Sequence, residues 1–245
     1  MGFFAKDEAK VMNAVLEVCS HLLLHNRTLE IILIDDGSCD GTEPMMRAFA
    51  AKNMESVVFI RNITSLGINK CAIQMARVAR GTTLLQVPGD YTYESTELER
   101  MLEAAPFPTQ SVFVVFGVRV GSVRTGGREL AAWFARNSLV WTKFKEFPVT
   151  NYGLILAPPD LLYRVGTQVG SYGSGTAQVG LIFLSGLPIA TIPVHQVASS
   201  GTRSSPITVR KIFDVASSHL WLLRHGRQAK REFWQARNSK TCRNL

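Results

Sequence analysis

The stretch from Ile31 to Thr42 constrains the fold of this chain more than any other. It reads Ile-Ile-Leu-Ile-Asp-Asp-Gly-Ser-Cys-Asp-Gly-Thr. A segment that is apolar at every position is typical of a strand buried on both faces, as in parallel sheets covered by helices. The two Asp-Gly pairs indicate turns, and Thr42 is expected to cap the helix that follows. Asp35 and Asp36 are therefore predicted at the carboxyl end of a parallel strand, where open α/β sheets bind ligands.

Helical and strand patterns alternate along the rest of the chain, which is the element order of an α/β domain. The patterns predict helices over Lys6–His25, Glu43–Asn53, Ser65–Ala79, Glu94–Ala104 and Ile207–Leu223. They predict further strands over Val57–Ile60, Thr82–Val87, Ser111–Phe116 and Ile189–Val194. A mostly parallel sheet with helices on both faces is the expected architecture.

Length, charge and cysteine content set limits on the function. The 245 residues suit one sizeable α/β domain, or a domain with a short appendage, and no apolar run is long enough to span a membrane. The net charge is +8, and seven basic residues against Glu232 alone place most of it between Arg224 and Leu245. The four cysteines have no metal-ligand spacing, which favours a reducing compartment. No nucleic-acid-binding motif accompanies the basic tail, so nucleic acid is not expected as a partner.

The central stretch resembles the Asp-Asp-Gly-Ser-x-Asp-Gly-Thr signature of family 2 glycosyltransferases with the GT-A fold. The resemblance implies a Rossmann-like, three-layer sandwich with a mostly parallel central sheet. It also implies that the first acid of the pair helps hold the nucleotide of a sugar donor. The candidate nucleotide-binding residues are Asp35, Asp36, Gly37, Ser38 and Lys70. The plainer alternatives are acids chosen for a turn and, at Lys70, a solvated surface lysine.

The beginning of the chain departs from the family pattern. A GT-A domain opens with an apolar strand that ends in an acidic segment, for which Asp7-Glu8 is the candidate match here. Only a few residues precede this pair, so the opening strand is expected to be truncated. Loss of a central strand would leave its neighbours with unpaired edges.

The segment Pro88-Gly89-Asp90 stands where the family carries an Asp-x-Asp metal motif. The resemblance implies that Asp90 binds Mg²⁺ or Mn²⁺ on the donor diphosphate and acts in catalysis. Hard oxygen ligands suit both ions, and one carboxylate together with substrate phosphates can still hold Mg²⁺. Because Pro88 replaces the first acid, a simple turn is the alternative.

Spaced arginines after residue 116 narrow the resemblance to the polyprenyl-phosphate sugar transferases, of the dolichyl-phosphate mannose synthase type. Arg119 is the candidate catalytic arginine, and the other candidate phosphate-binding residues are Arg128, Arg136, Arg203 and Ser204. Cations are needed where an acceptor phosphate approaches a nucleotide diphosphate, because the two anions repel each other. The alternative is that these arginines are simply solvated.

The acceptor is expected to be a phosphate. Transferases that use hydroxyl acceptors need a carboxylate as general base, and Thr176-Ala177-Gln178 supplies none where relatives carry it. A lipid phosphate is already anionic and needs no base. The expected reaction is inverting transfer of a hexose from a UDP- or GDP-sugar to a polyprenyl phosphate. The alternatives are transfer to a glycan hydroxyl and a degenerate homologue that binds nucleotide without turnover.

The resemblance implies a GT-A domain over residues 1–205 and an appendage over 206–245. The appendage combines an amphipathic helix, aromatic residues and basic residues, a composition suited to an anionic membrane surface. Packing on the domain with a solvated tail is the alternative. A cytoplasmic protein with peripheral contact to the membrane is therefore expected.

Overall fold

The computed structural model describes residues 1–26, 28–89, 92–104, 114–120, 152–169, 175–197 and 220–228 and positions 217, 231, 232 and 235. Eight strands of this described chain form a sheet in the order β3-β2-β1-β4-β7-β6-β8-β5. The strands are β1 Gly2–Ala5, β2 Ile31–Asp35, β3 Val57–Arg61, β4 Leu84–Pro88, β5 Thr92–Tyr93, β6 Val114–Val120, β7 Tyr152–Ala157 and β8 Ile189–Val197. All run parallel except β5 and β7, which pair antiparallel with their neighbours.

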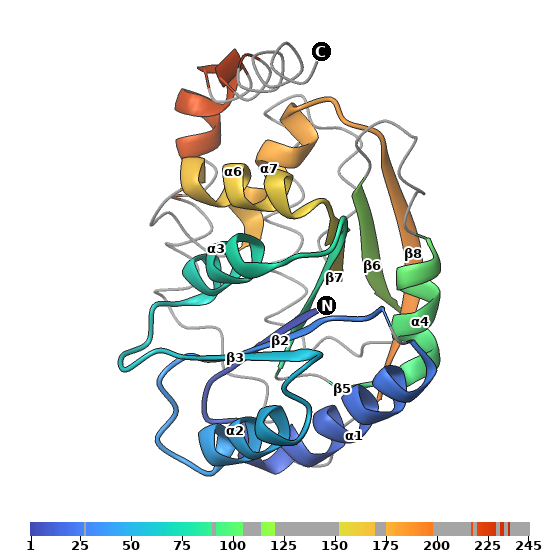
Figure 1. Ribbon diagram of the computed structural model, residues 1–245. Coiled ribbons are helices and arrows are strands. Elements are labelled where there is room, and N and C mark those ends of the chain that lie inside the picture. The colour runs from blue at the N-terminus through green and yellow to red at the C-terminus, as the bar shows by residue number, and fades with distance from the viewer. Residues whose placement is uncertain are drawn as a thin grey trace, which may run out of the picture. The chain divides into compact units, whose positions relative to one another are not determined.

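Helices cover both faces of this sheet. On one face α1 packs against α2 and α4, and α3 lies on the other face against β1 and β2 (Figure 1). The helices that the structure describes are α1 Ala9–His25, α2 Thr42–Lys52, α3 Ile68–Val78, α4 Ser95–Glu103, α6 Pro159–Val169 and α7 Gly175–Leu184. The α/β class with a mostly parallel sheet, predicted from the alternating patterns, is confirmed.

Strand β2 is buried over its whole length, as its unbroken apolar run predicts. Ile31 and Leu33 belong to the core cluster that contains α1 and α2 residues. Successive side chains of a strand point to opposite faces, so Ile32 and Ile34 lie toward α3. Asp35, the last residue of β2, therefore lies at the edge of a sheet that helices cover on both faces.

The opening strand is present, so the expected truncation of this strand is wrong. Gly2–Ala5 forms β1, which pairs in parallel with β2 on one side and with β4 on the other. Phe3, at 2% exposure, packs into the core. Four residues are too few to show a strand pattern in sequence, but hydrogen bonding on both sides is sufficient to hold them extended.

The first turn of α2 is capped differently from the prediction. Thr42 is the first helical residue rather than the cap. Asp40 Oδ1 accepts hydrogen bonds from Thr42 N at 2.9 Å and from Thr42 Oγ1 at 2.5 Å. The Thr42 hydroxyl oxygen in turn accepts from Glu8 N at 2.8 Å. An aspartate thus takes the capping role, which frees Thr42 to tie α2 to the start of α1.

The chain divides into two compact units. The first comprises Met1–Ser122, Asn151–Tyr163 and Pro188–Ser205. The second comprises Val123–Thr150, Arg164–Leu187 and Pro206–Leu245. Within the described residues, no helix is long and apolar enough to cross a bilayer. The described residues of the candidate site below belong to the first unit.

Candidate functional site

The carboxyl edge of the sheet carries Asp35 and Arg119, two of the described side chains predicted to act, together with Arg61, which the sequence did not single out. Arg61 ends β3, Asp35 ends β2, and Arg119 lies near the end of β6. Four strand spacings, about 19 Å in all, separate β2 from β6 along this edge. The edge is therefore long enough for an extended ligand to lie across several strands.

Asp36 is held by four donors from the segment between β3 and α3. Its Oδ1 accepts from Asn62 Nδ2 at 3.0 Å and from Leu66 N at 2.8 Å. Its Oδ2 accepts from Ser65 Oγ at 2.7 Å and from Gly67 N at 2.9 Å. The side chain is 6% exposed, and each oxygen has two donors. This carboxylate therefore holds the loop that precedes α3.

The same contacts shift the pKa of Asp36. Burial by itself favours the neutral acid, but the hydrogen bonds from Leu66, Ser65, Asn62 and Gly67 outweigh it and lower the pKa. The neighbouring Cys71 responds in the opposite sense, since burial and then the Asp36 charge raise the pKa of its thiol. Asp36 is thus an anion at neutral pH beside a neutral thiol.

Asp35 is fully buried at the end of β2. The Ser38 N–H lies 3.4 and 3.3 Å from its two carboxylate oxygens, and the Asp35 carbonyl accepts from Asn62 N at 2.8 Å. Among the described residues, its side chain has fewer donors than that of Asp36. Of the two acids, Asp35 is consequently the one with capacity to accept a further hydrogen bond.

Gly37 and Ser38 form the turn between these acids and α2. Gly37 has φ +76°, and a Cβ there would lie 3.0 Å from Ser65 N, so a side chain would strain the backbone and crowd the β3–α3 loop. Ser38 Oγ accepts from Asp7 N at 3.0 Å, and Asp7 Oδ1 accepts from Cys39 N at 2.7 Å. The loops after β1 and β2 are therefore locked together.

The predicted diphosphate and metal residues lie further along the edge. Lys70 is exposed in the first turn of α3. The Gly89 N–H donates to Phe4 O at 2.9 Å, which fixes the end of β4 beside β1. Asp90 follows Gly89 in sequence but lies outside the described residues. Within the described part of the chain, no group of three or more His, Cys, Asp or Glu side chains could hold a metal ion.

Arg119 meets Tyr93 above Gly153. Arg119 Nε donates to the Tyr93 hydroxyl at 3.4 Å, and Tyr93 is 2% exposed. A Cβ at position 153 would clash with the Tyr93 hydroxyl and lie 2.6 Å from Arg119 Nε. Gly153 thus provides the space in which these two polar groups meet. The sequence had no signal for Tyr93, because only pairing of β5 with β8 brings it to this edge.

The other residues predicted to bind phosphate are not among those that the structure describes. Arg128, Arg136, Arg203 and Ser204 lie outside the described residues. His195, near the end of β8, is exposed, and its Nδ1 lies 3.1 Å from Glu97 Oε1 on α4. This histidine, at the strand end, is therefore paired with a carboxylate.

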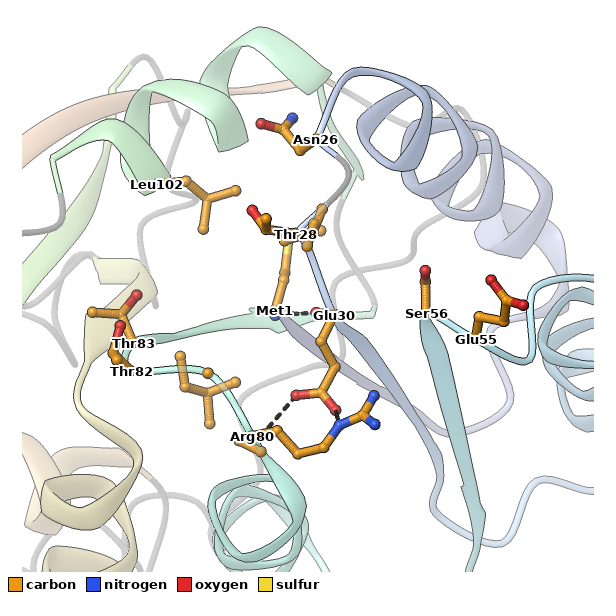
Figure 2. Close-up of a pocket in the computed structure, with 14 residues that line it drawn as sticks. Met1, Asn26, Thr28, Glu30, Glu55, Ser56, Arg80, Thr82, Thr83 and Leu102 are labelled. Carbon is orange, nitrogen blue, oxygen red and sulfur yellow. Dashed lines mark hydrogen bonds and ion pairs between the residues drawn. The ribbon is translucent and has the colours of Figure 1, made fainter.

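A cavity of about 580 Å³ lies at the opposite, amino edge of the sheet (Figure 2). Glu30 and Arg80 pair on its wall: Arg80 N and Nε donate to the two Glu30 carboxylate oxygens at 2.9 and 2.6 Å. Met1 N donates to Glu30 O at 2.6 Å. Parallel α/β sheets bind ligands at the carboxyl edge, so this cavity is no candidate for the reaction.

A comparison with protein-family models decides the family. The model for glycosyl transferase family 2 matches residues 5–165, which include both aspartates, α3 and Arg119. The chain belongs to glycosyl transferase family 2. This family 2 glycosyltransferase has no match among curated proteins.

Solved structures agree on the fold of this family 2 glycosyltransferase. Glucosyl-3-phosphoglycerate synthase from Mycobacterium tuberculosis, in complex with Mn²⁺, UDP and glucosyl-3-phosphoglycerate, is 15% identical with a TM-score of 0.62. That alignment covers 94% of this chain and 78% of the synthase chain. The mannosyltransferase PcManGT from Pyrobaculum calidifontis, in complex with GDP-Man and Mn²⁺, is 15% identical with a TM-score of 0.57 over 93% and 72% of the two chains. The GT-A fold predicted from the signature is confirmed.

Proposed function

We propose that this glycosyltransferase moves a hexose from a nucleotide-diphospho-sugar to a polyprenyl phosphate, with inversion at the anomeric carbon. The observation that carries the proposal is Arg119, a cation on the carboxyl edge four strands from Asp35. A donor that extends from β2 toward β6 would bring its sugar near this arginine. A phosphate acceptor fits a cation at that point better than a neutral hydroxyl does.

Asp35 and Ser38 would hold the nucleotide at the β2 end of the edge. Asp35, which is fully buried without a ligand, would accept from the base or ribose once donor binding uncovers its carboxylate, and Gly37 lets the loop backbone turn close to the ligand. Asp36 contributes by holding the β3–α3 loop, and Lys70, in the first turn of α3 that follows this loop, would reach the diphosphate. The solved relatives support a nucleotide donor, since their complexes contain UDP or GDP-Man.

A divalent cation is part of the proposal. Asp90, directly after the anchored Gly89, would hold Mg²⁺ or Mn²⁺ with the oxygens of the donor diphosphate. The ion would offset the charge of the leaving diphosphate. Complexes of the solved relatives contain Mn²⁺ or, in one case, Mg²⁺ with UDP.

The acceptor phosphate would be held by Arg119, with Arg128, Arg136, Arg203 and Ser204 as further candidate contacts. A phosphate oxygen attacks the anomeric carbon as the bond from that carbon to the diphosphate oxygen breaks. The nucleoside diphosphate then departs. Because a phosphate monoester has its second pKa at about 6, the attacking oxygen carries no proton at neutral pH. The described helix α7 contains no carboxylate, which agrees with a reaction that needs no general base.

The donor half is tested by calorimetric titration with UDP and GDP, with and without Mg²⁺ or Mn²⁺. We expect one nucleotide to bind, more tightly with metal, and Asp90→Ala to abolish the metal-dependent part. Glu55→Ala, an exposed acid at the amino edge, is the matched control and should bind as the unaltered chain does. If a folded chain binds neither nucleotide, the proposed donor site is wrong; binding without transfer would favour the degenerate homologue.

The acceptor half is tested by transfer from the matching labelled nucleotide-sugar to a short-chain polyprenyl phosphate. The polyprenyl alcohol, a glycan and phosphoglyceric acid, which a solved relative binds, are the competing acceptors. Transfer to the lipid phosphate alone supports the proposal. Transfer to a hydroxyl acceptor would contradict the proposal and favour the alternative, transfer to a glycan hydroxyl.

We also propose that the C-terminal appendage, after residue 205, contacts the cytoplasmic face of a membrane. In the described helix 220–228, Leu222 is buried at 4% exposure, whereas Leu220 and Leu223 are 49% and 58% exposed. Arg224 and Arg227 are exposed on the same helix. Aliphatic and basic side chains together suit an anionic interface. Removal of residues 206–245 should then reduce sedimentation with anionic vesicles.

A further inference from the structure

Three large apolar side chains are exposed on residues 61–70, the segment that leaves β3 and begins α3. Ile63 is 94% exposed, Ile68 52% and Leu66 38%. Figure 1 shows this connection, coloured cyan to teal, reaching away from the sheet before α3 begins. Several large aliphatic side chains exposed on one short segment indicate a contact surface.

The backbone of residues 61–70 is held from the protein side. Asp36 accepts from Leu66 N and Gly67 N, as described above. Asn62 and Gln74 exchange side-chain hydrogen bonds at 3.1 and 2.9 Å. These bonds fix the chain at Asn62, before Ile63, and at Leu66 and Gly67, before Ile68, while both isoleucine side chains lie exposed.

The charge of residues 61–70 favours an anionic partner. Arg61 and Lys70 are both exposed at its ends, and none of its ten residues is acidic. Among the described residues, two exposed acids share this edge, Asp7 and Asp40, and both already accept hydrogen bonds from backbone N–H groups. Aliphatic side chains flanked by cations are the composition of segments that insert into anionic bilayers.

We infer that residues 61–70 are a membrane-contact surface that seats the carboxyl edge of the sheet on an anionic lipid bilayer. The surface follows β3, whose last residue pairs in register with Asp35. The inference deepens the proposed function and rests on it for its purpose, since a lipid-borne acceptor must reach this same edge. It is separate from the appendage, because it belongs to the first compact unit.

The test is sedimentation of the full chain with vesicles of phosphatidylcholine, with and without phosphatidylglycerol. We expect binding to the anionic vesicles that weakens with salt, and about tenfold weaker binding for Ile63→Ser/Ile68→Ser. The matched control is Leu24→Ser/Met54→Ser, which removes two apolar side chains, each 80% exposed, at the opposite edge of the sheet. This control should bind as the unaltered chain does.

Circular dichroism and titration with UDP and GDP accompany each variant. Equal vesicle binding by the two double variants, or no binding by the unaltered chain, would overturn the inference. So would a loss of nucleotide affinity in Ile63→Ser/Ile68→Ser with unchanged vesicle binding, because the side chains would then serve the donor. Vesicle binding requires no sugar transfer, so failure of the proposed function would be seen separately.

Discussion

At the scale of single residues, the two adjacent aspartates have different surroundings. Asp36 lies past the end of β2 and receives four donors, whereas Asp35 lies within β2 and has Ser38 N as its side-chain donor. A charged acceptor with several donors stabilises a fold more than a neutral one does, because each such hydrogen bond is stronger. Asp36 thus contributes to the stability of the fold and is also a residue of the family signature.

Asp36→Asn is expected to reduce the free energy of unfolding by about 2–4 kcal/mol at pH 7, since an amide nitrogen would face donors. The folded-state pKa of Asp36 is lowered, so its charge stabilises the fold above the unfolded pKa of about 3.9. That stabilisation is lost as the pH falls through the folded-state pKa. Urea unfolding at several pH values should show the variant's deficit shrinking in acid. A deficit that is constant with pH would contradict this account.

Gly153→Ala is expected to displace the Arg119 guanidinium, because the added Cβ would occupy the space in which Tyr93 and Arg119 meet. Activity toward the acceptor should fall about tenfold or more through KM for the acceptor, with little change in donor affinity. Steady-state kinetics with each substrate varied in turn measures this split. Tyr93→Phe, which removes the hydroxyl but adds no bulk, should have the smaller effect. Equal loss of donor and acceptor affinity would indicate general damage instead.

At the scale of elements, β1 is a strand of only four residues on which the fold depends. It joins β2 to β4, and its Phe3 enters the core between the sheet and the helices α1 and α2. A central strand supplies hydrogen bonds on both sides, so the loss of its packing weakens both neighbours.

Phe3→Ala is expected to lower the free energy of unfolding by about 3–5 kcal/mol, the cost of a large cavity in a core. Chemical denaturation followed by circular dichroism measures the change. Ile63→Ala is the control, because its side chain is 94% exposed, and it should alter stability by less than about 0.5 kcal/mol. Similar effects of the two substitutions would mean that β1 is not part of the core.

At the scale of the whole molecule, burial divides the cysteines of the first unit. Cys19 and Cys71 are fully buried, and Cys39 is exposed in the loop after β2. Burial raises the pKa of the Cys19 thiol to about 12 and also raises that of Cys71. The thiolate is the reactive form, so both thiols are protected from reagents by their burial and also by their raised pKa values.

Iodoacetamide at pH 8 is expected to label Cys39 within minutes, and to label Cys19 and Cys71 only at the rate of global unfolding. Peptide mass mapping over time measures the three positions separately. In denaturant all three should react alike. Rapid labelling of Cys71 in the native chain would show that α3 opens locally, against the hydrogen bonds that Asp36 makes.

The sequence by itself determined the α/β class, the run of elements and the edge that carries the site. Periodicity and turn residues are local properties, so β2, α1 and most other described elements could be predicted to within a few residues. The same holds for the position of Asp35, because the end of a buried strand is visible in one short stretch.

Only the tertiary structure decided which polar groups contact one another. Asp36 meets its donors at residues 62–67, and Tyr93, Arg119 and Gly153 come from three strands that are distant in sequence. The strand β1 likewise exists because β2 and β4 pair with it on both sides. Such contacts depend on pairing between segments far apart in the chain, and local sequence patterns do not predict that pairing.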